Sequence, residues 1–179
     1  MEFNYELKIP KERIAVLIGK NGEVKKDLEE ATGIFIDVDS KEGDVKIKGE
    51  NSLNLFALKE VILAVSRGFN PDTAQLLLKQ DYVLEIIPIL DFIKNKNHLE
   101  RLKGRVIGAK GKSRNTIERL TETYISVYGK TISIVGRAEN VMSAKKAVES
   151  LLNGSPHSNV YRFLERNKVR LKRKELSEW

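Results

Sequence analysis

The sequence contains no cysteine and only two histidines among its 179 residues. The lack of cysteine excludes disulfide bonds and thiolate metal sites, and it is typical of proteins in a reducing compartment. No apolar run approaches the roughly 18 residues that a membrane-spanning helix needs. The N-terminal stretch MEFNYELKIP also lacks the basic start and apolar segment of a signal peptide. We therefore expect a cytoplasmic protein that makes no membrane contact.

A further absence concerns VIGAKGKS, residues 106–113, which ends in the Gly-Lys-Ser triplet of a nucleotide-binding P-loop. A P-loop has another glycine five positions before the glycine of that triplet, and it follows a strand. Here Val106 occupies that position, and the preceding HLERLKGRV predicts a helix. The spacing therefore excludes an ATPase of the P-loop class.

The positive charge is unevenly distributed along the chain. The formal net charge is +7, yet residues 1–70 carry 11 basic and 13 acidic residues. Residues 71–155 carry 14 and 9, and residues 156–179 carry 7 and 3. A polyanionic partner is therefore expected to meet the C-terminal part of the chain first.

An internal repeat organises the sequence. IGKNGEVKKDLEEATGIFIDV (18–38) aligns without a gap on IGAKGKSRNTIERLTETYISV (107–127). Gly19 matches Gly108, Gly22 matches Gly111, and the apolar alternation continues into a further pair of strands. Repetition at this length indicates two related units in tandem.

Each unit predicts the order β-α-α-β-β-α. In the first unit the patterns predict strands and helices over residues 3–9, 11–18, 23–32, 34–38, 45–47 and 53–65. In the second unit they predict elements within 82–89 and over 98–107, 112–123, 124–128, 131–135 and 138–152. We expect domains at 1–69 and 81–155, a linker with a short helix at 70–80, and a basic helical tail at 156–179. The predicted fold class is α+β.

Each Gly-x-x-Gly lies between two short helices and before an alternating strand. This context resembles a type I KH domain, whose GxxG loop clamps the backbone of about four nucleotides. The resemblance covers about 150 of the 179 residues. It implies three-stranded sheets packed against three helices, and single-stranded RNA as the ligand.

The two loops supply the first set of candidate RNA-binding residues. Those of the second unit, with their neighbours, are Arg105, Gly108, Ala109, Lys110, Gly111, Lys112, Ser113 and Arg114. Those of the first unit are Gly19, Lys20, Asn21 and Gly22. Because Glu23 and further acids follow the first loop, we predict that the second module dominates RNA binding. The alternative is that these charges only solvate the faces of their helices.

Aliphatic side chains supply the second set, since the resemblance implies that bases lie on such side chains beside a strand edge. The candidates are Ile14, Ile18 and Ile36 in the first unit, and Ile107, Ile117 and Ile125 in the second. Each of them is equally suited to the hydrophobic core, so this reading stays open.

The segment after the second unit indicates which family of KH-domain proteins the chain resembles. Gly154, Pro156, Ser158, Val160 and Tyr161 resemble the post-KH segment of the "partner of Nob-one" family of small-subunit assembly factors, which has an archaeal two-KH relative of about this length. The resemblance implies binding near the 3′ end of small-subunit ribosomal RNA, and cooperation with a PIN-type maturation nuclease or another ribosome or translation factor. Eukaryotic members have a degenerate first glycine loop, whereas this chain keeps GKNG. Whether the first module binds RNA or protein therefore stays open.

The tail predicts an amphipathic helix with one apolar side and one basic side. Arg170, Lys172 and Arg173 on the basic side are candidate phosphate contacts. The alternative is a helix that only packs on the second module.

Other functions fit parts of the sequence. A KH adaptor in RNA decay or translation regulation would share the fold, and a protein-only scaffold would not need the loops. A metal-dependent nuclease would need the acidic cluster Asp37, Asp39, Glu42 and Asp44 to hold Mg²⁺. This cluster has no counterpart in the second unit, and charged turns are common. We therefore predict a non-enzymatic monomer without cofactor or metal.

Overall fold

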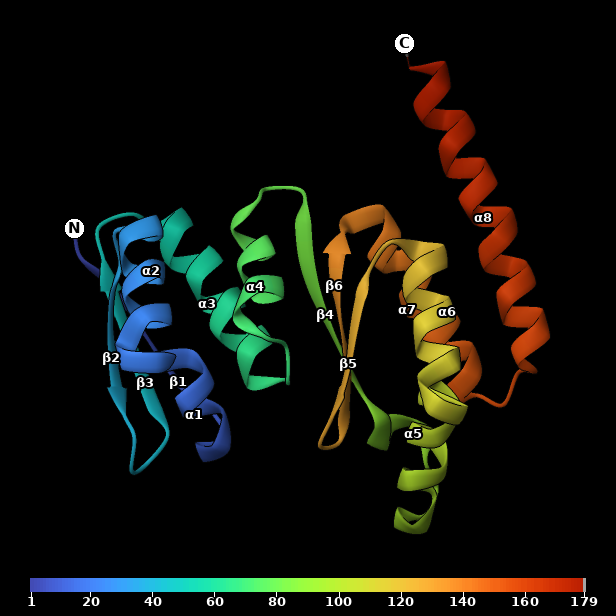
Figure 1. The fold of residues 1–179 in the computed structure, drawn as a ribbon, viewed down its shortest axis with the longest axis horizontal. Coiled ribbons are helices and arrows are strands. Elements are labelled where there is room, and N and C mark those ends of the chain that lie inside the picture. Colours follow the sequence, from blue (N-terminus) through green and yellow to red (C-terminus); the bar gives the residue numbers. More distant parts are fainter. Residues whose placement is uncertain (179) are drawn as a thin grey trace. The chain divides into compact units, whose positions relative to one another are not determined.

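The structure is a computed structural model that describes residues 1–178. Two compact units follow each other along the chain, and the division falls between Tyr82 and Val83 (Figure 1). Each unit has a three-stranded antiparallel sheet with helices on one face. No helix among the described residues is long and apolar enough to span a lipid bilayer.

The first unit follows the predicted order of elements. These are β1 (Phe3–Lys8), α1 (Lys11–Ile18), a 3₁₀ turn η1 (Lys20–Gly22), α2 (Glu23–Thr32), β2 (Phe35–Asp39), β3 (Asp44–Gly49) and α3 (Ser52–Ser66). The strand order is β1-β3-β2, so the last strand in sequence lies in the middle of the sheet. Ile47 of β3 pairs with Tyr5 on one side and with Ile36 on the other.

Alternation in the central strand fixes which face of this sheet is covered. Val45 and Ile47 are fully buried, whereas Lys46 and Lys48 between them are exposed. Because successive side chains of a strand point to opposite faces, the helices must cover the face of Val45 and Ile47. The helix ends also follow local signals, since α2 stops at Gly33 in the left-handed region.

The segment expected as a linker continues the first unit. It forms α4 (Pro71–Ala74) and the 3₁₀ turn η2 (Gln75–Leu78), both packed against α3. Ala74 and Leu77 are buried there. The Asn70 side chain accepts a hydrogen bond from the Thr73 amide and caps α4.

The second unit repeats the arrangement. Its elements are β4 (Tyr82–Pro88), the 3₁₀ turns η3 (Ile89–Phe92) and η4 (Lys96–His98), α5 (Leu99–Ile107), η5 (Ala109–Gly111), α6 (Lys112–Thr121), β5 (Tyr124–Tyr128), β6 (Thr131–Arg137) and α7 (Ala138–Leu152). The strand order β4-β6-β5 matches that of the first sheet. The predicted α+β class and both β-α-α-β-β-α units are therefore confirmed.

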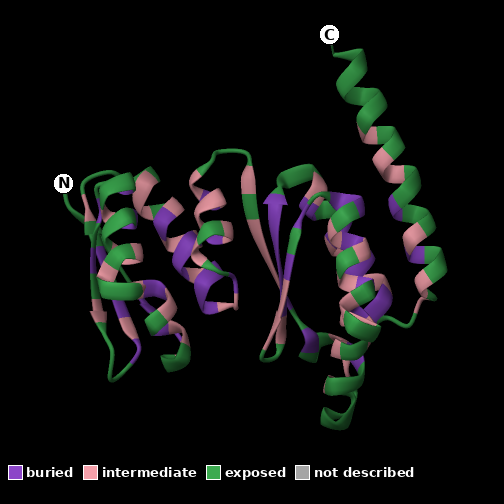
Figure 2. Cartoon of the chain, viewed as in Figure 1, coloured by how far each residue is buried: buried purple, intermediate pink, exposed green. Residues whose placement is uncertain are grey.

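The tail forms one long helix, α8 (His157–Ser177), which belongs to the second unit. It packs against α6 and α7, where Val160 and Leu164 join the hydrophobic core. The rest of its surface is mostly exposed (Figure 2). The amphipathic pattern of the sequence thus becomes one buried stripe and one solvated face.

Candidate nucleic-acid interface

The two Gly-x-x-Gly loops have nearly the same backbone conformation. Gly19 has φ 76° and ψ 176°, and Gly108 has φ 73° and ψ 173°. The third residue of each loop lies in the left-handed region, with φ 55° at Asn21 and φ 53° at Lys110. The loop in each unit therefore turns the chain in the same way from one helix into the next.

Close packing requires the first glycine of each loop. A Cβ on Gly108 would lie 2.7 Å from the backbone nitrogen of Ser113, and one on Gly19 would lie 2.9 Å from that of Val24. The last glycines, Gly22 and Gly111, also have positive φ, but an added Cβ would meet nothing within 4 Å at Gly22 and only the Asn115 side chain at 3.8 Å at Gly111. The first glycine thus serves the fold, while the last leaves room for a ligand to approach the backbone.

The middle residues of both loops face solvent. Lys20, Asn21, Ala109 and Lys110 are all exposed, so α8 does not cover the loop of the second unit. Among residues 1–178, no side chain caps the N-terminus of α6 with a hydrogen bond. A helix N-terminus presents unpaired amides and a positive dipole end, which is a favourable place for a phosphate.

The charges around the two loops differ as the sequence predicts. The first turn of α6 contains no acid, and Lys112 is exposed there. The first turn of α2 contains Glu23, and Lys25 forms an ion pair with Glu29 at 3.6 Å. We therefore expect the second loop to attract an anionic ligand more strongly.

Ser113 distinguishes the second loop from the first. Its side chain is only 2% exposed, and its hydroxyl has no hydrogen-bond partner among the described residues. The matching position in the first unit is Val24. The neighbouring Arg114 is half-buried, and its Nε is also unpartnered within the described chain.

Arg105 has a different role from the predicted one. Its Nε donates to the Leu151 carbonyl at 2.9 Å and its Nη2 donates to the Ser155 carbonyl at 2.6 Å. The guanidinium therefore holds the C-terminal end of α7, so we do not propose Arg105 as an RNA contact. Arg13 of α1 makes the equivalent contacts at the end of α3, with the carbonyls of Val65 and Phe69.

The predicted isoleucines fall into two groups. Four are buried at 5% exposure or less, so their side chains belong to the cores and offer no surface to a base: Ile14, Ile36, Ile117 and Ile125. Ile18 and Ile107 are half-buried at the ends of α1 and α5, immediately before the loops. Only this second pair remains suited to a base contact.

A pair of glutamates that the sequence reasoning missed organises the adjacent strands. Glu29 accepts a hydrogen bond from the Ile36 amide at 2.8 Å, and Glu118 accepts one from the Ile125 amide at 2.8 Å. These two glutamates occupy matching positions in the repeat alignment, so their recurrence in the sequence could have identified them. Each one ties the second helix of its unit to the strand that follows.

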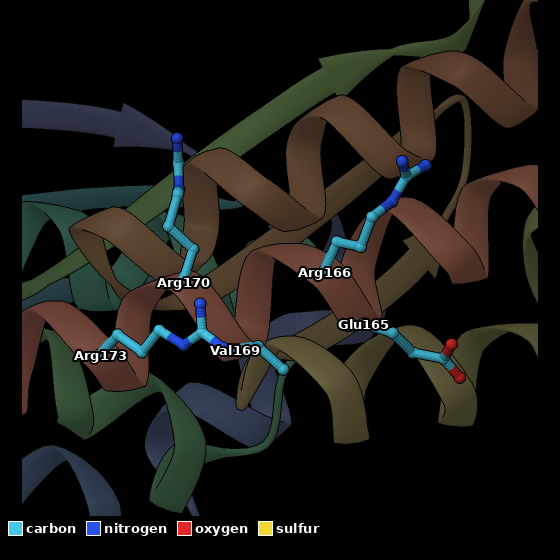
Figure 3. A pocket seen from close by; sticks show the side chains of 5 residues that line it. All are labelled: Glu165, Arg166, Val169, Arg170 and Arg173. Carbon is cyan, nitrogen blue, oxygen red and sulfur yellow. The ribbon is translucent and has the colours of Figure 1, made fainter.

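The basic side of α8 is exposed as predicted. Arg170, Lys172 and Arg173 are all exposed. A shallow depression on the helix surface is lined by Glu165, Arg166, Val169, Arg170 and Arg173 (Figure 3). Lys172 does not line this depression.

The acidic cluster of the first unit forms a turn. The Asp39 carboxylate accepts hydrogen bonds from the amides of Lys41 and Glu42, which lower the pKa of Asp39. Within residues 1–178, no group of three or more acidic or histidine side chains is placed to hold a metal ion. Asp39, the last residue of β2, thus holds the turn between β2 and β3.

Comparison with protein families matches both units. A KH-domain model matches residues 4–64. A model described as the eukaryotic type KH domain, KH type I, matches residues 83–169. The second match extends beyond α7 and includes the first half of α8.

Individual relatives match most of the chain. A KH domain-containing protein of Methanocaldococcus jannaschii is 46% identical over 97% of this chain and 78% of its own length. The pre-rRNA-processing protein pno1 of Emericella nidulans is 34% identical over 70% of this chain. The match spans 46% of that longer fungal protein.

Two solved structures of similar chains come from Pyrococcus horikoshii. A chain in the crystal structure of an a/eIF2alpha–aDim2p–rRNA complex is 43% identical with a TM-score of 0.89, covering 94% of this chain and 96% of that one. The crystal structure of Dim2p from the same organism gives 44% identity and a TM-score of 0.86, covering 92% and 99%. At these identities and TM-scores, the similarity in sequence and the similarity in fold indicate the same relatives.

Proposed function

Because this chain belongs to the family of tandem KH-domain proteins that includes archaeal Dim2p and eukaryotic PNO1, we propose that it is an RNA-binding assembly factor of the small ribosomal subunit. Its ligand is single-stranded ribosomal RNA near the 3′ end. One observation carries the proposal: an exposed Gly-x-x-Gly loop leads into the uncapped, acid-free N-terminus of α6.

The phosphate backbone is held by the loop of the second unit. Gly111 has no side chain of its own, and the nearest atom to an added Cβ is the Asn115 side chain at 3.8 Å, so an RNA strand can approach the loop backbone closely. The exposed ammonium groups of Lys110 and Lys112 lie on either side of this glycine in the sequence and contribute positive charge. Within the described chain neither lysine forms an ion pair, so both remain available to phosphates.

The first unit contributes a second, weaker contact. Its loop has the same conformation and exposes Lys20 and Asn21. Glu23 in the next helical turn opposes a phosphate there. If both loops hold one strand, their linkage raises affinity by about 10² to 10⁴ through effective concentration.

The proposed role is binding and not catalysis, and it includes a protein partner. The P. horikoshii relative was crystallised in an a/eIF2alpha–aDim2p–rRNA complex, which favours a translation factor as partner. The PIN-type maturation nuclease is the other candidate that the family suggests. An adaptor role in RNA decay would use the same loops on other RNAs.

A loop variant tests the proposal on the full-length chain. The double change Ala109→Asp and Lys110→Asp should lower affinity for a 3′-terminal small-subunit rRNA oligonucleotide by at least about tenfold, since a charge-assisted contact contributes about 1.5–3 kcal/mol. Fluorescence anisotropy gives the affinity, and circular dichroism checks the fold. Lys20→Asp with Asn21→Asp is the matched control and should have a smaller effect.

Two results would contradict this function. One is an unchanged affinity of a folded Ala109→Asp, Lys110→Asp variant. The other is crosslinking from cells that yields dispersed messenger RNA and no ribosomal RNA precursor, which would favour the adaptor role. Mg²⁺-dependent RNA cleavage that disappears with Asp37→Ala would instead support an enzyme.

A further inference from the structure

The exposed side of α8 carries a row of four arginines. Arg162, Arg166, Arg170 and Arg173 follow each other at intervals of four, four and three residues, and all are exposed. At about 1.5 Å rise per residue, neighbouring guanidinium groups start about 4.5 to 6 Å apart along the axis. This step is comparable to that between successive phosphates along one RNA strand.

The protein holds this row straight. Val160 and Leu164 anchor the start of α8, and the Asn167 amide donates to the Ser143 hydroxyl of α7. Near the end of the helix, the Lys174 ammonium lies 3.1 Å from the Glu139 carboxylate of α7. Contacts at both ends keep the helix in one position, so the spacing of the arginines is preset.

The chemistry of the row favours phosphates over other partners. The apolar side of α8 is already buried against α6 and α7 and is unavailable to a lipid surface. The exposed large apolar side chains of α8 are Phe163, Val169 and Leu176, too few for the apolar centre of a protein interface. Arginine forms planar, bidentate hydrogen bonds with phosphate, which a row of lysines would not.

We propose that the arginine row of α8 binds the phosphate backbone of a double-stranded RNA segment. A duplex keeps its phosphates at regular spacing, so a rigid row matches it, whereas a flexible single strand needs no such match. The inference rests on the proposed function, because the duplex would adjoin the single strand held by the loop. In Figure 3, Arg166 and Arg170 extend to the same side of the helix, while Glu165 points away from them.

Two RNA probes separate this site from the loop. One is the single-stranded 3′-terminal oligonucleotide, and the other is the same strand joined to a hairpin. The triple change Arg166→Gln, Arg170→Gln and Arg173→Gln keeps good helix formers in α8. For the hairpin probe it should lower affinity about 10- to 100-fold at 0.15 M salt and flatten the salt slope by about 2 to 3, as expected for three duplex phosphates.

The single-stranded probe should bind the triple variant and the natural protein equally. A charge-matched control, Lys94→Gln with Lys96→Gln and Lys146→Gln, removes three exposed cations of the same unit and should leave both affinities within about twofold. Glu165→Gln removes the acid beside the row and should strengthen hairpin binding alone.

Each other outcome overturns the inference. Equal losses for both probes would place the row in the single-strand site. No loss, or a loss only for an acidic protein partner, would show that the row does not bind duplex RNA. An equal loss of hairpin affinity in the lysine control would show that net charge causes the effect and the arginine row does not. Failure of the natural protein to bind the single strand would instead defeat the proposed function, and is seen without any α8 variant.

Discussion

The two glycines of the second loop should respond very differently to alanine. Gly108 has φ 73° and ψ 173°, a region that is essentially limited to glycine and costs other residues about 1–3 kcal/mol. Its added Cβ would also meet the Ser113 nitrogen at 2.7 Å, and a backbone atom cannot move aside as a side chain can. Such overpacking adds about 1–3 kcal/mol, so Gly108→Ala should cost about 2–6 kcal/mol in total.

Gly111→Ala avoids the close contact with a backbone atom that destabilises Gly108→Ala. Its φ of 75° and ψ of 11° cost an alanine about 1–2 kcal/mol, and the nearest atom to the new Cβ is the Asn115 side chain at 3.8 Å. The loss of unfolded-state entropy returns about 0.4–1 kcal/mol. The net destabilisation should therefore stay below about 2 kcal/mol, while the methyl group blocks the approach of RNA.

Urea unfolding and RNA titration of both full-length variants separate the two roles. Gly108→Ala should lower the unfolding midpoint of the second unit clearly more than Gly111→Ala does. Gly111→Ala should lose RNA affinity while it stays folded. Equal destabilisation by both changes, or full RNA affinity of Gly111→Ala, would refute the assignment of Gly108 to folding and of Gly111 to RNA binding.

Three further predictions concern contacts outside the loops. Arg105→Gln should destabilise the second unit by about 1–3 kcal/mol in urea unfolding, because it removes charged donors to two carbonyls, and the salt slope of RNA binding should not change. Glu118→Ala leaves the Ile125 amide without its acceptor and should cost about 1–3 kcal/mol by the same measurement; a neutral result would mean that water replaces the carboxylate. Glu60→Gln should raise the melting temperature at pH 7, because burial raises the pKa of Glu60 above its ordinary value of 4.5 and disfavours the charged form in the folded state. That gain should shrink as the pH falls through the raised pKa and vanish below about pH 4.5, where Glu60 is protonated in both states, and a gain that persists at pH 3 would contradict it.

The fold was largely predictable because the same sequence pattern occurs twice in the chain, once in each unit. Alternation at Val45 and Ile47, the stop at Gly33 and the glycine loops all act locally, so the sequence shows them directly. The end of α6 was predicted two residues late, at position 123. The helix stops at Thr121 because Glu122 takes a left-handed conformation with φ 54°, and no glycine announces this.

The site was predictable in its backbone but less so in its side chains. The exposure of Lys110 follows from the loop itself. The hydrogen bonds of Arg105 and the burial of Ile36 depend instead on residues that are distant in sequence. Arg105 is 46 residues from Leu151, the carbonyl that it holds. Charge and hydropathy alone do not distinguish an arginine that binds phosphate from one that ends a helix.

The arginine contacts at the ends of α3 and α7 bear on how the repeat should be compared with other proteins. Arg13 and Arg105 reach corresponding carbonyls, yet under the gap-free alignment Arg13 matches Leu102 and Arg105 matches Val16. The two halves have kept an interaction while moving its donor by one helical turn. An alignment of the two halves by position alone therefore does not pair these arginines. A comparison of repeat units in homologues should look for a basic residue on either turn of the helix.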